Sequence, residues 1–311
     1  MSQHMSAPVL DKSNSEFYTH GWFAQTWQLV LWNLYHLRRR LMTRILLGIF
    51  FGGYALLLLI TILSHILLGN NHGPTIGADP IMALVFPGSL QFMLGYLGLL
   101  APIFLCIIAG ALIGGDYGYG LHRQMLTRGL SRAQVFTAQV LALSLLVLGF
   151  VGIAILLSIL LGMLIGPLFG IAPTLLPLNG WLGVVLTWLT QSVRYFLYML
   201  IAVLAATIGR SVLAGIAFSI GYVFVEFLAT TILFSLVGGL SVTVGNAIVS
   251  FVSNLPGVVT NTLNSYSTAV IVGQPIASLS ELPWQIFLTV AYCAILIAVS
   301  YFVYSRSDIF D

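Results

Sequence analysis

Six long apolar runs constrain the fold of this chain more than any other feature. Each contains at least the ~20 residues that an α-helix needs to cross ~30 Å of hydrocarbon. Only 6% of the residues are charged, against roughly 25% in soluble domains. We therefore predict an all-α membrane protein, with one transmembrane domain over residues 41–311. Its six transmembrane helices would cover residues 45–68, 90–113, 135–165, 181–208, 212–237 and 284–304.

The first 40 residues are predicted to form a cytoplasmic N-terminus with an interfacial helix. Ser13 and Glu16 have the spacing of a capping box, which would open a helix at about residue 16 that ends near residue 40. Tryptophans settle at the headgroup level of a bilayer, and arginines favour its anionic inner leaflet. A helix packed on protein is the alternative. The expected membrane anchors are Trp22, Trp27, Trp32, Arg38, Arg39 and Arg40.

The basic residues predict the orientation of the chain. In a six-span arrangement almost all of them fall on one side, and the other side has none. Because positive charge accumulates in cytoplasmic loops, both termini and the loop at residues 114–134 are expected in the cytoplasm. The residues on that side are Lys12, Arg38, Arg39, Arg40, Arg44, Arg123, Arg128, Arg132, Arg210 and Arg306.

Two further connections have readable patterns. Three prolines between the third and fourth runs exclude one continuous helix there. The outer loop at residues 238–283 has apolar residues at helical spacing beside Asn246, Ser250 and Asn254. This pattern predicts one or two amphipathic helices that lie on the outer surface or dip into the membrane.

The polar segment from Gly114 to Gln139 separates the second and third runs and contains three arginines. A short basic helix on the cytoplasmic face is suited to docking a soluble partner through charge-assisted contacts. Ser131 and Gln134 form a capping box that would start the third span. The alternative is that these arginines only set the topology and hold lipid headgroups.

The sequence contains no Walker A motif, because Lys12 is its single lysine and no glycine-rich loop precedes it. If transport uses ATP, another polypeptide must hydrolyse it. No metal-ligand or catalytic motif occurs either, so an intramembrane enzyme is disfavoured.

The segment from Asp116 to Val140 resembles the cytoplasmic loop of ABC exporter permeases of the second type (ABC-2). An acidic residue stands first, GLHR at 120–123 resembles the family's GTLR block, and MLTRGLSR at 125–132 resembles its LLTRPxSR block. The ending SRSDI at 305–309 resembles the family's Arg-Asp-Ile tail. The chain departs from the family pattern at Leu121, Gly129 and Gln139.

The resemblance implies a coupling helix that sits in a groove on a nucleotide-binding subunit. The chain would be a transport subunit without enzymatic activity, in the plasma membrane of a bacterium. Two ABC-type ATPase subunits would hold the ATP and Mg, and a second permease, expected to be identical, would complete the transporter. The ATPase-coupling residues would be Asp116, Gly120, His122, Arg123, Leu126, Arg128, Ser131 and Arg132.

The apolar spans favour export of an amphipathic or hydrophobic substrate, such as a drug, a lipid or an antibiotic peptide, which would link the chain to antibiotic resistance. Expected partners are therefore the ATPase, the second permease and membrane lipid, with no nucleic acid. No cofactor or metal is expected on this chain.

Arg194 and Glu226 are the strong charges deep within the spans. They lie 15 residues before Gly209 and 16 after Arg210, so both would be about 23 Å from the turn between two antiparallel helices. An unpaired charge at that depth costs several kcal/mol, which predicts an ion pair. The pair could line a translocation cavity or could be a static bridge. A secondary transporter or channel that uses this pair without an ATPase is the alternative function.

Small residues open the fifth run at one-turn spacing, at Ser211, Gly215 and Ser219. Such a stripe permits close helix contact, either at a homodimer seam or within one protomer. His65 and Asp79 are isolated and are expected to be interfacial polar residues.

Overall fold

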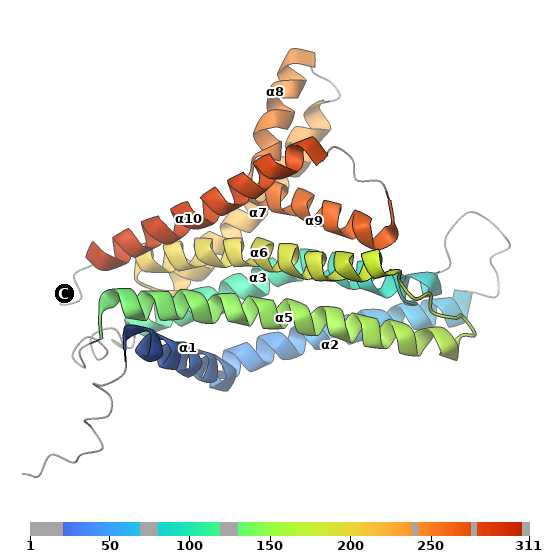
Figure 1. Ribbon diagram of the computed structural model, residues 1–311, viewed down its shortest axis with the longest axis horizontal. Helices are drawn as coiled ribbons and strands as arrows, with labels where there is room; N and C mark the ends of the chain where they lie inside the picture. Colours follow the sequence, from blue (N-terminus) through green and yellow to red (C-terminus); the bar gives the residue numbers. More distant parts are fainter. Residues whose placement is uncertain (1–20, 69–79, 119–129, 238–241, 275–278, 307–311) are drawn as a thin grey trace, which may run out of the picture.

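The computed structural model describes residues 21–68, 80–118, 130–237, 242–274 and 279–306 (Figure 1). Within these ranges the chain contains helices and no strand. Six helices are long and apolar enough to cross a membrane, which confirms the predicted spans to within a few residues at each end. They are α2 (Leu41–Leu68), α3 (Gly88–Gly118), α5 (Arg132–Leu168), α6 (Leu178–Gly209), α7 (Val212–Val237) and α10 (Leu282–Arg306).

The remaining helices are too short or too polar to count among these spans. The predicted amphipathic loop contains two of them, and Figure 1 shows α8 projecting from the bundle while α9 lies along α6. The predicted proline break is also confirmed, because α5 ends at Leu168 and α6 begins directly after Pro177. These helices are α1 (Trp22–Arg39), α8 (Val242–Ser253), α9 (Pro256–Val272) and two short 3-10 turns, η3 (Pro80–Ala83) and η4 (Leu279–Glu281).

The helix α1 confirms the predicted N-terminal helix over the described residues and has two different faces. One face packs on α5, where Val30 meets Ala138 and Ala142. The rest of the helix surface leaves Trp22, Phe23, Trp27 and Trp32 exposed. One stripe of α1 therefore packs on protein, while these aromatic side chains are free for the predicted membrane surface. The predicted capping box at Ser13 lies outside the described residues.

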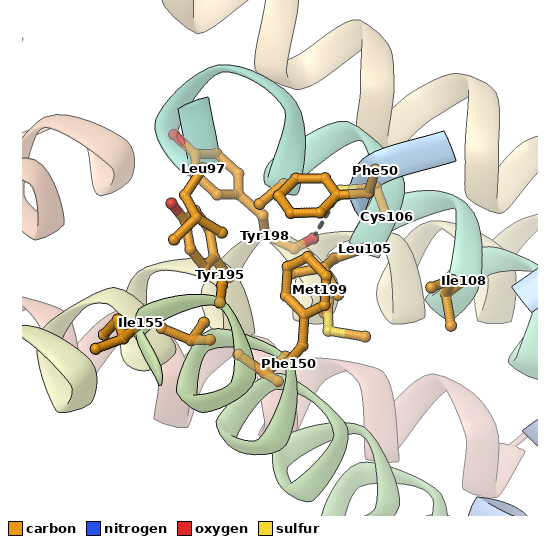
Figure 2. Close-up of a cluster of buried hydrophobic side chains, with 14 of the residues drawn as sticks. Phe50, Leu97, Leu105, Cys106, Ile108, Phe150, Ile155, Tyr195, Tyr198 and Met199 are labelled. Carbon is orange, nitrogen blue, oxygen red and sulfur yellow. Dashed lines mark hydrogen bonds between the residues drawn. The ribbon is translucent and has the colours of Figure 1, made fainter. Parts of the chain in front are cut away.

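The core of the bundle lies where α3, α5 and α6 meet (Figure 2). Leu97, Leu105, Val147 and Met199 are fully buried there. In the same cluster the Phe50 ring of α2 packs against the Phe150 ring of α5, with the ring centroids 4.8 Å apart. The helices α2, α7 and α10 are mostly exposed and apolar, as expected for lipid-facing helices.

Glycines let α3 and α7 approach closely. A Cβ on Gly110 would lie 2.9 Å from the Ile216 backbone nitrogen, and one on Gly215 would lie 2.9 Å from the Gly110 Cα. In a membrane, close van der Waals packing of this kind replaces the hydrophobic effect as the force between helices. Of the two predicted uses of the small-residue stripe at Ser211, Gly215 and Ser219, contact within one protomer is the one observed.

The described arginines other than Arg194 gather at one end of the bundle, which we call the basic end. It holds the link between α1 and α2, the start of α5, the turn between α6 and α7 and the end of α10, on the left in Figure 1. This clustering agrees with the charge asymmetry of the sequence. Its placement in the cytoplasm stays a prediction.

Candidate functional site

The predicted docking segment emerges from the basic end. The helix α3 ends at Gly118, and the described chain resumes at Leu130, just before α5. The predicted contacts Gly120, His122, Arg123, Leu126 and Arg128 lie outside the described residues, so their docking role stays a prediction. The residues that hold the two ends of this segment in place are described. We call them the loop anchor: Arg40, Asp116, Ser131, Arg132, Gln134 and Gln139.

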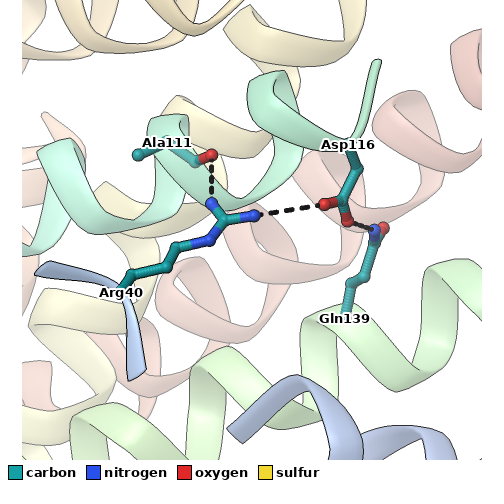
Figure 3. Close-up of polar contacts among 4 residues, drawn as sticks. All are labelled: Arg40, Ala111, Asp116 and Gln139. Atoms are coloured by element: carbon teal, nitrogen blue, oxygen red, sulfur yellow. Dashed lines mark hydrogen bonds and ion pairs between the residues drawn. The ribbon is translucent and has the colours of Figure 1, made fainter. Parts of the chain in front are cut away.

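Asp116 is the centre of the loop anchor (Figure 3). One carboxylate oxygen accepts from Arg40 at 3.4 Å, and the other accepts from Gln139 Nε2 at 2.7 Å. Arg40 also donates to the Ala111 carbonyl at 2.7 Å. Since Arg40 links α1 to α2, and Gln139 belongs to α5, this cluster fixes the last turns of α3 to three other helices. Arg40 and Asp116 form the one salt bridge among the described residues.

The burial of Asp116 changes its expected role. The residue is only 2% exposed and both of its oxygens have donors, so it holds the bundle together rather than facing a partner. Gln139 is a departure from the family pattern, and its neutral amide leaves one cation opposite one carboxylate in this pocket. Sequence reasoning missed this contact, because 23 residues separate Asp116 from Gln139.

The start of α5 confirms the predicted capping box. The Gln134 N–H donates to Ser131 Oγ at 3.2 Å, and the Ser131 N–H donates to Gln134 Oε1 at 2.9 Å. Gln134 Nε2 also donates to Gln25 of α1 at 3.1 Å. The cap therefore fixes both the first turn of α5 and its distance from α1.

Arg132 connects the same region to the last spanning helix. Its guanidinium donates to the Ser305 carbonyl in the final turn of α10, where backbone carbonyls lack helical partners. Beside it, the Tyr304 ring packs against the rings of Phe136 and Tyr117, with ring centroids 5.6 Å and 6.5 Å apart, respectively. The two ends of the docking segment are thus joined to α1, α3, α5 and α10.

The predicted ion pair between Arg194 and Glu226 is wrong. Glu226 accepts from the Tyr198 hydroxyl at 2.9 Å and from the Gly257 backbone N–H at 2.7 Å. Arg194 donates instead to Asn261 Oδ1 at 3.0 Å. Both charged residues therefore bond to α9, and they share no hydrogen bond or salt bridge.

The helix α9 explains this correction. The helices α6 and α7 are neighbours at this level, as the Tyr198–Glu226 bond shows, but α9 also begins there and supplies a partner to each charged residue. The first N–H groups of a helix have no internal acceptor and carry partial positive charge, so they suit a carboxylate such as Glu226. A Cβ on Gly257 would overlap the Tyr198 hydroxyl and lie 2.6 Å from Glu226 Oε2. The pair Pro256-Gly257 was the sequence signal for this helix start.

The contacts between α6 and α9 continue as a line of polar residues, which we call the polar seam. At one end of this seam the Thr187 hydroxyl donates to Ser267 at 3.0 Å. The seam then passes Arg194, which donates to Asn261, and ends at Tyr198, which donates to Glu226. Gln191 Oε1 and Asn264 Oδ1 are buried without a hydrogen-bond partner among the described residues. Polar groups are costly in hydrocarbon and are expected to face another helix or a water-filled cavity.

An apolar cavity of about 400 Å³ lies beside this seam, between α6, α9 and α10. Thr190, Tyr266, Ser267 and Thr289 contribute the hydroxyls in its lining. Over the described ranges, no three His, Cys, Asp or Glu side chains lie close enough together to hold a metal ion.

The chain was also compared with known proteins. Comparison with protein-family models, with curated proteins and with solved structures finds no match. The functional assignment therefore depends on the residues of the loop anchor and the polar seam, together with the resemblance carried by residues 116–140.

Proposed function

We propose that this chain is the transmembrane subunit of an ATP-driven exporter of the ABC-2 type. A separate ATPase subunit would dock on residues 114–134 at the cytoplasmic face and drive an amphipathic or hydrophobic substrate outward. The observation that carries the proposal is the loop anchor, which ties both ends of the docking segment into the spanning helices. The working transporter would contain two permeases and two ATPase subunits.

The loop anchor gives a physical route for coupling. Hydrogen bonds to charged groups contribute about 1.5–3 kcal/mol each, so displacement of the docking segment would move the attached helix ends together rather than break these bonds. The helix α3 continues from Asp116 to the level of Arg194, whose Nη1 lies 4.0 Å from the Cβ position of Gly98. Movement at the basic end would therefore reach the polar seam through α3.

Co-purification in detergent with the ATPase of a neighbouring gene tests this proposal. We expect a stable complex with the unmodified chain and loss of that complex in the double variant Arg123→Glu with Arg128→Glu. The matched control is Arg38→Glu with Arg39→Glu, which reverses two exposed arginines at the end of α1. Equal loss in both double variants would mean that general surface charge, and not docking on this segment, holds the ATPase.

A second candidate function is a secondary transporter or channel that needs no ATPase. It is favoured by α9, a short helix whose N-terminus meets Glu226 deep within the spans. Helix ends at the bilayer midplane form the ion and substrate sites of many secondary transporters. Uptake by the chain alone in liposomes under a proton or sodium gradient, lost in Glu226→Gln, would support this function and contradict the first.

A further inference from the structure

Arg194 of α6 is partly exposed, between Gly98 of α3 and Asn261 of α9. Its guanidinium donates to Asn261, whose side chain is exposed, and its Nε has no acceptor among the described residues. On the α3 side the neighbours are glycines. A Cβ on Gly98 would lie 4.0 Å from Arg194 Nη1, and one on Gly95 would have nothing within 4 Å. The guanidinium is therefore only partly covered at the middle of a spanning helix.

The positive charge of Arg194 has no anionic hydrogen-bond partner in the described structure. Glu226 is the carboxylate nearest to it in the spans, and both oxygens of Glu226 already accept from Tyr198 and Gly257. The Tyr195 ring, at 5.9 Å, and the Asn261 amide are both neutral. A static structural role would predict a direct bridge to Glu226, and the geometry differs from that expectation.

We propose that the partly exposed guanidinium of Arg194 binds an anionic group, a phosphate or a carboxylate, that is carried on an apolar body. The planar guanidinium suits such anions because it can donate two parallel hydrogen bonds. Asn261 and Ser265 expose polar side chains along the same face of α9, and Leu99, 69% exposed, offers apolar surface next to Gly98. The inference rests on the proposed function, since it names the substrate class that the exporter would accept.

Binding to the purified full-length chain in maltoside detergent tests the site directly. The probe is palmitoyl lysophosphatidic acid, and the control ligand is monopalmitoylglycerol, which has the same tail without the phosphate. Native mass spectrometry measures the bound fraction of each. We expect Arg194→Gln to weaken binding of the phosphate probe by about tenfold, equivalent to about 1.4 kcal/mol, and to leave the neutral ligand unchanged.

A second variant guards against misfolding of the first. Gly98→Val keeps every charge and covers the guanidinium of Arg194, so it is expected to weaken binding of the phosphate probe as well. The matched control is Gly221→Val, on the exposed side of α7, where an added Cβ meets nothing within 4 Å. Unchanged phosphate binding in both Arg194→Gln and Gly98→Val, with normal elution in size-exclusion chromatography, would overturn the site.

Competition with inorganic phosphate separates the two sources of the anion. We expect free phosphate to displace the lysophosphatidic acid only weakly, because it lacks the apolar body. If inorganic phosphate displaced the bound probe as effectively as added lysophosphatidic acid does, the proposal of an amphiphilic ligand would be overturned. The site would then bind free anions.

The assay contains no ATPase, so its result is independent of docking. Arg194-dependent binding without any ATPase complex would contradict the proposed function and leave the anion site standing. A stable ATPase complex without Arg194-dependent binding would contradict the anion site alone.

Discussion

The loop anchor and the polar seam each hold a buried carboxylate, and they neutralise it in different ways. Asp116 forms a salt bridge with Arg40 and accepts from Gln139, so its charge is balanced within one pocket. Glu226 accepts from a hydroxyl and from the start of a helix, and Arg194 bonds elsewhere. The first arrangement is complete and suits a mechanical connection. The second leaves a cation with spare donors and suits a ligand.

The largest expected effect is the loss of Arg40. Removing one partner of a buried ion pair leaves the other charge uncompensated, so Arg40→Ala should lower the free energy of unfolding by about 3 kcal/mol. Thermal unfolding of the detergent-purified chain measures the change. Arg38→Ala, at an exposed position two residues earlier on α1, is the control and should be nearly neutral. Equal stability of both variants would show that the salt bridge contributes nothing.

The next largest effect is expected at Gly257. Gly257→Ala places a methyl group against the Tyr198 hydroxyl and Glu226, and overpacking of this kind costs about 1–3 kcal/mol. Gly48→Ala in α2, where an added Cβ meets nothing within 4 Å, is the matched control. Unfolding measurements on both should show a loss only for Gly257→Ala. An undisturbed Gly257→Ala protein would mean that α9 does not approach Glu226 as closely as described.

Double-mutant cycles sharpen the contrast between the two regions. Because Arg40 and Asp116 touch, truncating both to Ala should reveal a coupling energy of about 1–3 kcal/mol. Arg194 and Glu226 share no direct bond, so the same cycle should give a smaller coupling than the Arg40–Asp116 pair. A coupling between Arg194 and Glu226 as large as that of the Arg40–Asp116 pair would instead restore the static bridge predicted from the sequence.

The charge swap Arg194→Glu with Glu226→Arg follows from the same contrast. An arginine at position 226 would face the Tyr198 hydroxyl and the Gly257 N–H, which donate to the native carboxylate. The double swap should therefore be no more stable than the worse single variant. Recovery of folded yield in the double swap would contradict the described contacts.

The smallest effect is expected at the cap of α5. Ser131→Ala removes the acceptor of the Gln134 N–H and should cost about 1 kcal/mol. Amide hydrogen exchange in the first turn of α5 should become faster, with little change in α6. Ser131→Asn, another good capping residue, should restore slow exchange.

The sequence predicts the parts of this fold that depend on local pattern. Hydropathy locates all six spans, proline locates the break before α6, and the spacing of Ser131 and Gln134 locates a cap that the structure contains. Side-chain partners were predicted poorly. Asp116 was expected to face a partner because the resemblance places it at the acidic position of a coupling loop, whereas the packing of α3 against α5 buries it.

The error at Arg194 and Glu226 has a similar origin. Counting residues along α6 and α7 gives the depth of each charge but not which other groups compete for it. The position of α9 depends on tertiary packing across more than thirty residues of chain, which no local pattern encodes. The start of α9 at Pro256-Gly257 was readable, whereas its contact with Glu226 was not.

The most direct test of the central claim is ATP hydrolysis by the ATPase with and without this subunit. The account predicts that the unmodified chain forms a complex and changes the hydrolysis rate. Gln139→Met, which removes one bond to Asp116 at nearly constant volume, should keep the complex and lose much of that change. No complex with the ATPase, or a Gln139→Met complex that hydrolyses ATP like the unmodified one, would contradict coupling through the loop anchor.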